Sequence, residues 1–319
     1  MKSLLTPKQV ARAIGVSESS LKRWCDKGLL TTQKTVGGHR RLPFNDVIQF
    51  LRQSGQRLSQ PELLGLPATA GQGSTVISRA CEQVVAALVV GDAEQVRRLI
   101  VDLYLAGQRA VEICDKVLAE ALHRIGQQWG HGEVEVYQER RAVEIVVRVL
   151  YELREMLPSL SPSAPAAFGG TLSGDFYILP TTMAELALRE AGWRADSFGT
   201  NLPPETFAAA LASNCAPLAW LSVSHIPDRT TFLSDYERVA RAASLAGTAL
   251  VVGGRALDAE LRQDMQFAAA CDNFRHLVGF AANLPAARAA GASVKSGQTA
   301  AVESESRPPN PTAVESVDN

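Results

Sequence analysis

The spacing of apolar residues changes along this chain, and that change constrains the fold more than any single motif. Between residues 74 and 157, apolar side chains recur at helical spacing in four stretches that short glycine-containing turns separate. Between residues 167 and 290, short apolar runs bounded by turn residues alternate with helical stripes. The first pattern predicts a four-helix bundle. The second predicts a flavodoxin-like (Rossmann-type), doubly wound parallel sheet, with its ligand edge at the carboxyl ends of the strands.

The α/β pattern is regular enough to place its elements. Strands are expected at 166–172, 193–198, 217–224, 248–252 and 276–280. Helices are expected at 182–191, 204–213, 235–246 and 257–268. Aromatic residues make up only 6% of the chain, which favours helices and α/β layers over an all-β fold.

The first 57 residues are strongly basic, in contrast to the rest of the chain. They hold eleven Lys and Arg against three acids, a net charge of +8, whereas the whole chain carries −1 and the remainder therefore −9. A small basic module joined to an acidic body indicates a head that binds duplex DNA. Charge alone leaves RNA and membrane surfaces open, because basic segments bind these as well.

Helix signals in this basic segment predict a helix-turn-helix. Thr6 is placed as an N-cap with Pro7 at the first helical position, and Ser17 caps a second helix over 18–27 after a turn at Gly15. The second helix is expected to enter the major groove. Its candidate DNA-binding residues are Ser17, Ser19, Ser20, Lys22 and Arg23.

A hairpin that turns at Gly37-Gly38 is expected after the second helix, as a wing. His39, Arg40 and Arg41 follow the turn, and we expect them to reach phosphates or a minor groove. The alternative for the two arginines is a pair of solvated loop charges. Two roles stay open for His39, a contact with the DNA backbone or packing within the hairpin. Trp24 is expected in the core.

The segment LTPKQVARAIGVSESSLKRWCDKGLL, followed by GGHRRLP, resembles the MerR family of winged-helix transcription regulators over residues 4–53. The resemblance implies a regulator that binds double-stranded DNA. One small head offers a limited contact surface, so we expect a homo-oligomer, dimer or tetramer, that places two heads on adjacent half-sites.

Segments rich in Gly, Pro, Ser and Gln divide the chain into domains. The expected order is a winged helix-turn-helix at 1–55, a linker at 56–73, the bundle at 74–158, the α/β domain at 166–290 and a disordered tail at 291–319. No apolar run reaches the ~18 to 20 residues of a membrane helix. The start of the chain lacks a signal-peptide core. The five cysteines are scattered without CxxC spacing. These features predict a cytoplasmic protein with free thiols and no membrane partner.

The bundle followed by the α/β pattern resembles the cobalamin-binding module of methionine synthase and of the CarH/LitR-type light-dependent repressors. Those relatives have a loop Asp-x-His-x-x-Gly, whose His ligates cobalt, then a Ser that meets the displaced nucleotide base, and a Gly-Gly beside the nucleotide tail. This chain keeps Asp175, Ser222 and Gly253-Gly254. Tyr177 stands at the His position and Pro180 at the Gly position. A phenol with a pKa near ~10 is a poor replacement for imidazole on cobalt.

The bundle carries a second part of the same resemblance. Photoreceptor relatives have Trp-x9-Glu-His over the upper face of the corrin, and this chain has Trp129 and, after nine residues, Glu139-Arg140. One interpretation is a retained cavity that admits a flat ligand. The other places Trp129 in the bundle core and pairs Glu139 with a neighbouring arginine. His131 and His225 have no metal-ligand spacing and are expected to be structural.

The sequence therefore predicts a DNA-binding regulator rather than an enzyme. Its body would act through oligomerisation, a partner protein or a ligand other than His-ligated cobalamin. One alternative is a cobalamin-dependent light sensor in which cobalamin binds base-on or through another lower group. A second alternative is a corrinoid carrier for methyl transfer. The cofactor, the operator and the sign of regulation stay open.

Overall fold

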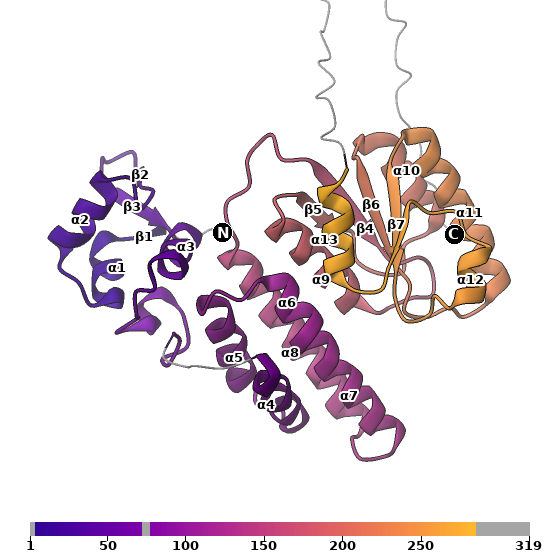
Figure 1. Cartoon of the computed structure of the whole chain (residues 1–319), viewed down its shortest axis with the longest axis horizontal. Coiled ribbons are helices and arrows are strands. Elements are labelled where there is room, and N and C mark those ends of the chain that lie inside the picture. The colour runs from indigo at the N-terminus through magenta and orange to yellow at the C-terminus, as the bar shows by residue number, and fades with distance from the viewer. Residues whose placement is uncertain (1–3, 72–76, 285–319) are drawn as a thin grey trace, which may run out of the picture. The chain divides into compact units, whose positions relative to one another are not determined.

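The computed structural model describes residues 4–71 and 77–284 (Figure 1). The tail predicted at 291–319 lies outside the described residues, as do 72–76, where the predicted linker meets the predicted bundle.

The head begins with two helices, α1 (Pro7–Ile14) and α2 (Glu18–Asp26). The hydroxyl of Thr6 accepts the amide of Gln9 at 3.1 Å, and the side chain of Gln9 accepts the amide of Thr6 at 2.9 Å, which forms a capping box. Ser17 caps α2 by accepting the amide of Ser20 at 3.1 Å. Both caps are at the residues that the sequence predicted.

A small antiparallel sheet and a third helix complete the head. Strands β1 (Leu4–Leu5), β2 (Gln33–Lys34) and β3 (Arg40–Pro43) pair in the order β1-β3-β2. The turn between β2 and β3 forms the predicted wing, with Gly38 in the left-handed region at φ 78°. Helix α3 (Phe44–Ser54) follows directly.

The segment predicted as a linker is packed over its described part. It contains the short 3-10 helix η1 (Pro61–Leu64), and its buried residues include Leu58, Leu64, Leu66 and Ala70. The amide of Ser59 donates to the carbonyl of Ala13 at 2.7 Å, so the segment lies against α1. The Gly, Pro, Ser and Gln content predicted a linker, but these apolar side chains join the core that the head and the bundle share.

Four helical stretches form the predicted bundle: α4 (Ile77–Val90), α5 (Ala93–Leu105), a third stretch, and α8 (Val136–Met156). The third stretch consists of α6 (Ala110–Ile113), a π-helical turn η2 (Cys114–Leu118) and α7 (Ala119–Gly130). Within the described ranges, no helix has both the length and the apolar composition that crossing a membrane requires.

Helix α3 of the head contacts the bundle directly. The side-chain Nε2 of Gln49 donates to the hydroxyl of Tyr104 at 3.2 Å and to the carbonyl of Met156 at 2.8 Å. The guanidinium of Arg52 lies 3.7 Å from the centre of the buried Tyr104 ring. The apolar core continues from the head into the bundle.

The last part is a five-stranded, fully parallel sheet in the order β5-β4-β6-β7-β8. Its strands are β4 (Ala166–Gly170), β5 (Arg194–Ser197), β6 (Leu218–Ser222), β7 (Ala249–Gly253) and β8 (Ala269–Cys271). Helices α9 (Ile178–Glu190) and α13 (Phe274–Ala282) cover one face, and α10 (Pro204–Asn214), α11 (Arg229–Ala246) and α12 (Ala259–Gln263) cover the other (Figure 1). This is the flavodoxin-like order, which confirms the predicted fold class.

Two predictions at the end of the sheet are wrong. The run 276–280, predicted as the last strand, lies in α13, and the edge strand is β8. The helix predicted over 257–268 is reduced to the five residues of α12. A short apolar run does not distinguish strand from helix. The side chain of Asn273 accepts the amide of His276 at 2.9 Å, and this N-cap is the local signal that starts a helix there.

Candidate functional site

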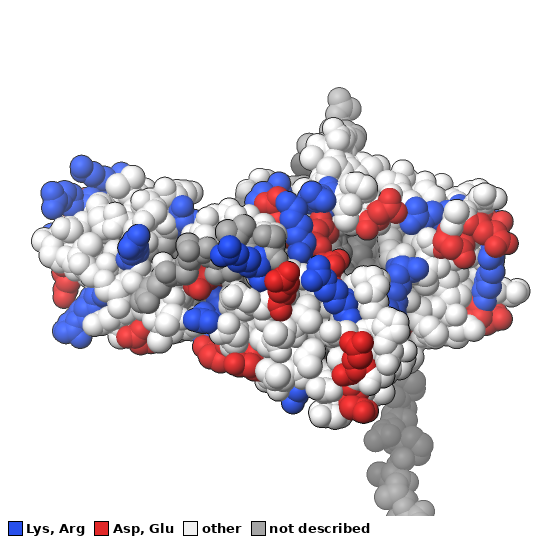
Figure 2. All heavy atoms as spheres, turned by 60° about the horizontal axis from the view of Figure 1, so that its bottom comes forward, with Lys and Arg blue, Asp and Glu red and all other residues white. Residues whose placement is uncertain are grey.

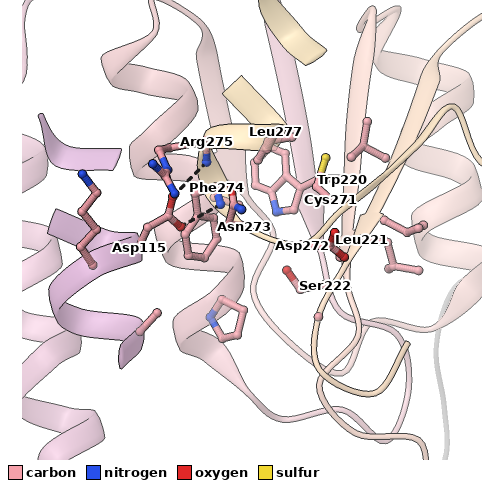
Figure 3. Close-up of a pocket in the computed structure, with 18 residues that line it drawn as sticks. Asp115, Trp220, Leu221, Ser222, Cys271, Asp272, Asn273, Phe274, Arg275 and Leu277 are labelled. Atoms are coloured by element: carbon pink, nitrogen blue, oxygen red, sulfur yellow. Dashed lines mark hydrogen bonds and ion pairs between the residues drawn. The ribbon is translucent and has the colours of Figure 1, made fainter. Parts of the chain in front are cut away.

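A cavity of about 360 Å³ lies between the bundle and the carboxyl edge of the sheet (Figure 3). Asp115 and Lys116 of the π-helical turn line it from the bundle side. Ser222, Gly253 and Gly254 line it from the strand ends, where the sequence predicted a ligand site. The structure therefore brings these three predicted residues together in one cavity.

Asp115 joins the bundle to the α/β domain at the wall of this cavity. Its carboxylate accepts the backbone amides of Phe274 at 2.9 Å and Arg275 at 3.1 Å, and it pairs with the Arg275 side chain at 3.3 Å (Figure 3). The first amides of a helix have no partner within the helix. Asp115 thus caps α13 from a distant part of the chain. Sequence reasoning did not single out Asp115, since no local pattern connects it to α13.

A second carboxylate makes the reciprocal contact. Glu190, the last residue of α9, accepts the amides of Ala110 at 2.6 Å and Val111 at 3.2 Å, at the beginning of α6. Each of the two parts therefore supplies a carboxylate to a helix start of the other. This pair of caps connects the bundle to the sheet domain, and the cap at Asp115 lines the cavity.

Asp175 is buried and connects two loops that follow strands of the sheet. It is 3% exposed and its carboxylate accepts three amides: Tyr177 at 3.0 Å, Ser224 at 2.6 Å and His225 at 3.3 Å. These contacts connect the loop after β4 to the loop after β6. Asp175 was predicted as a cofactor-binding residue, but it is outside the cavity lining and its carboxylate is occupied by backbone amides.

Tyr177 also lies outside the cavity lining, and it is half-exposed at the start of α9. The Arg255 guanidinium lies 4.6 Å from the centre of its ring, and the His225 ring lies 6.5 Å away. The loop after β4 thus presents a phenol beside a cation, without an imidazole. The residues present do not fit a cobalt corrin that is ligated from this loop.

The two glycines are required by the sheet itself. A Cβ on Gly253 would lie 2.7 Å from the carbonyl oxygen of Cys271, and one on Gly254 would lie 2.2 Å from that of Val223. Gly254 also has a φ of 127°. Their presence in the sequence is therefore explained by strand packing without any ligand. Pro180 lines the cavity from the first turn of α9, where its missing N–H breaks no helical hydrogen bond.

Trp129 and Glu139, which the resemblance places over a flat ligand, are not part of the cavity lining. Trp129 is 53% exposed near the end of α7, which rules out the interpretation as a bundle-core residue. Glu139 pairs with Arg140 at 3.8 Å, as the solvent alternative predicted. Neither side chain lines the cavity.

The head presents a second candidate site on α2. Lysine and arginine side chains gather on the head, at the left of Figure 2. Ser19, Lys22 and Arg23 are exposed on α2. The Ser17 hydroxyl is committed to the cap and contacts those of Ser19 at 2.8 Å and Ser20 at 3.0 Å. The exposed cations of α2 are Lys22 and Arg23.

The wing residues are not equivalent to one another. Arg40 pairs with Asp26 of α2 at 2.9 Å, whereas the Arg41 side chain donates to the carbonyl of Arg40 at 3.2 Å. His39 is exposed beyond the turn, and its amide donates to the hydroxyl of Thr35 at 3.2 Å. Trp24 packs against Phe50 with ring centres 5.0 Å apart, which agrees with its predicted role in the core.

Comparison with known proteins agrees with this division of the chain. Residues 4–55 match a helix-turn-helix domain family, and residues 80–154 match the B12 binding domain family. The chain therefore carries a helix-turn-helix domain followed by a B12-binding domain. No curated protein matches the chain significantly.

One solved structure with a TM-score above 0.5 shows the same fold for the body, and two further structures are similar at lower scores. The monomethylamine corrinoid protein of Methanosarcina barkeri is similar with a TM-score of 0.56 and 15% identity, over 65% of this chain and 98% of its own. A cobalamin-binding protein of Desulfitobacterium hafniense DCB-2 has a TM-score of 0.37 and 14% identity, over 64% and 98%. The methanol:cobalamin methyltransferase complex of Methanosarcina barkeri has a TM-score of 0.34 and 13% identity, over 68% and 83%.

Proposed function

We propose that this chain is a DNA-binding transcription regulator of MerR type, and not an enzyme. The observation that carries the proposal is the exposed basic face of α2, with a wing beside it, on the same chain as a B12-binding domain. A helix in the major groove beside a wing is an established way to read duplex DNA. The acidic body would then supply the signal or the assembly that the head requires.

The body is proposed to act as a homo-oligomerisation or sensing module without cobalamin ligated from the loop after β4. Tyr177 and the position of Asp175 support this part of the proposal. The ligand would be a different one, or the body would contact a partner protein.

The test uses the full-length protein and a pool of random duplex DNA. Repeated selection should enrich one sequence, and its affinity should fall steeply with salt because Lys and Arg release counterions from DNA. Light scattering should show more than one chain on each selected duplex. Failure to enrich any sequence, together with the absence of salt-dependent binding, would refute the proposal.

A corrinoid carrier is the second candidate, and a specific observation favours it. The fold likeness covers 98% of the monomethylamine corrinoid protein. The basic head and the phenol of Tyr177 are evidence against a carrier function. Titration with hydroxocobalamin, followed by its absorbance spectrum, separates the two: a carrier binds it stoichiometrically with a change in the spectrum. The same titration with adenosylcobalamin, before and after illumination, tests the light-sensor alternative.

A further inference from the structure

We propose that Arg40 is a positioning residue that holds the wing against α2, and that it does not contact a phosphate. Through this pair, Asp26 would limit binding to any duplex, whatever its sequence. The inference rests on the proposed function, because it concerns how the head reads duplex DNA. It departs from the prediction that Arg40 and Arg41 act alike on the DNA backbone.

Asp26 lies on the face of α2 that carries the free basic residues. Side chains three and four positions apart lie on one face of a helix, so Asp26 shares a face with Lys22 and Arg23. Its side chain is 49% exposed. A carboxylate on this face is repelled by the phosphates that the face would approach. This repulsion opposes binding to every duplex, whatever its sequence.

Arg40 neutralises that carboxylate from the wing. Its guanidinium lies 2.9 Å from Asp26 and joins two elements that are fourteen residues apart in the chain. In the part of the chain that the structure describes, Asp26 has no other ion-pair partner. If Arg40 moved to a phosphate, an unpaired carboxylate would remain at the interface. The new contact would therefore be offset by the repulsion.

The geometry of the hairpin separates Arg40 from Arg41. Successive side chains of a strand point to opposite faces, so Arg41 points away from the face on which Arg40 meets α2. Lys22 and Arg23 form no ion pair within residues 4–71 and 77–284. They are therefore the donors on this face whose charge is available to phosphates.

The experiment measures affinity against salt concentration for full-length variants, on the selected duplex and on an unselected one. Each lost phosphate contact lowers the slope of log affinity against log salt by about 0.9. Arg40→Gln should leave the slope unchanged and weaken the selected duplex about two- to fivefold, the range that an exposed ion pair supplies. Lys22→Gln is the matched control, since it removes a free cation from the same face and should lower the slope by about 0.9.

Asp26→Asn gives a result that a purely structural role would not produce. It releases Arg40, so the slope should become steeper by about 0.9 and the unselected duplex should bind more tightly. The selected duplex should gain affinity by a similar factor, because the repulsion does not depend on sequence.

The inference is overturned if Arg40→Gln lowers the slope as Lys22→Gln does, or if Asp26→Asn leaves it unchanged. Circular dichroism confirms that each variant is folded, as expected for exposed side chains. In both of these outcomes the selected duplex still binds, so the proposed function survives. Absence of any selected duplex would instead refute the proposed function itself.

Discussion

The carboxylate of Asp115 accepts the backbone amide of Phe274 at 2.9 Å, across 159 positions of the chain. This bond connects the π-helical turn of the bundle to the first turn of α13, at the wall of the cavity. Glu190 makes the reciprocal bond to the start of α6. Two carboxylates that serve as helix caps therefore connect the bundle to the α/β domain, in addition to the apolar packing of α9 against the bundle.

Replacing Asp115 by Ala should loosen this junction. The free energy of unfolding should fall by about 1 to 2 kcal/mol, the upper part of the range for a lost helix cap, because the ion pair with Arg275 is lost as well. Urea denaturation measures the loss, and hydrogen exchange should accelerate at the amides of Phe274 and Arg275. Asp258→Ala is the control, because Asp258 caps α12 locally by accepting the amide of Leu261. Equal rates of hydrogen exchange at the first amides of α13 in the two variants would contradict the assignment of Asp115 as a cap of α13.

Gly254→Ala tests whether this glycine serves the sheet. Its added Cβ would meet the carbonyl oxygen of Val223 and would also be strained at a φ of 127°. Gly192→Ala is a control with strain alone, since its φ is 92° and its Cβ would meet open space. The control should lose about 1 kcal/mol of stability from the strained backbone, and Gly254→Ala clearly more. Similar losses in the two variants would show that packing does not require glycine at 254.

Two aspartates should affect stability in opposite directions as the pH changes. Burial raises the pKa of Asp102 above its ordinary 3.8, although its carboxylate accepts the amide of Gly71. The folded state therefore prefers the protonated form, and the stability from this group is lost as the pH rises through the raised pKa. Asp102→Asn should gain stability relative to the original chain between about pH 4 and about pH 7.

Asp228 is the counterpart with the opposite sign. Hydrogen bonds from the backbone and side chain of Thr231 hold its pKa below 3.8, so its contribution is present at neutral pH and is lost as the pH falls through the lowered pKa. Asp228→Asn should lose stability relative to the original chain at about pH 7 and less so at about pH 3. Urea denaturation across this range checks both variants. If the free energy of unfolding changed with pH in the same way for the two variants, the opposite signs of the two pKa shifts would be contradicted.

Adenosylcobalamin should bind weakly or not at all, and light should leave DNA binding and oligomer size unchanged. The loop after β4 offers the phenol of Tyr177, and Pro180 follows in the first turn of α9, where it fixes the backbone angle φ. The double variant Tyr177→His and Pro180→Gly should strengthen binding, whereas Tyr177→Phe should not. Absorbance titration in the dark, with size analysis before and after green light, measures this. Binding by the original chain at micromolar concentration or tighter, with a light-driven change in assembly, would favour the light sensor.

The sequence by itself determined the elements that local signals encode. The caps at Thr6 and Ser17, the four helical stretches of the bundle and four of the five strands follow from spacing and turn chemistry within a few residues. Ser222 and Gly253 were also predictable as members of one site, because the carboxyl ends of parallel strands meet at one edge. These local signals do not depend on residues that are distant in the sequence.

Only the tertiary structure decided what the charged side chains do. Asp115 caps a distant helix, Asp175 joins two loops, and Arg40 pairs with Asp26 instead of standing free. The last strand was misplaced because a run such as 276–280 suits either a strand or a helix until its neighbours are known. A carboxylate or a guanidinium has many partners of equal chemistry in the sequence. The fold selects one of them by bringing it within hydrogen-bonding distance, and no local pattern contains that choice.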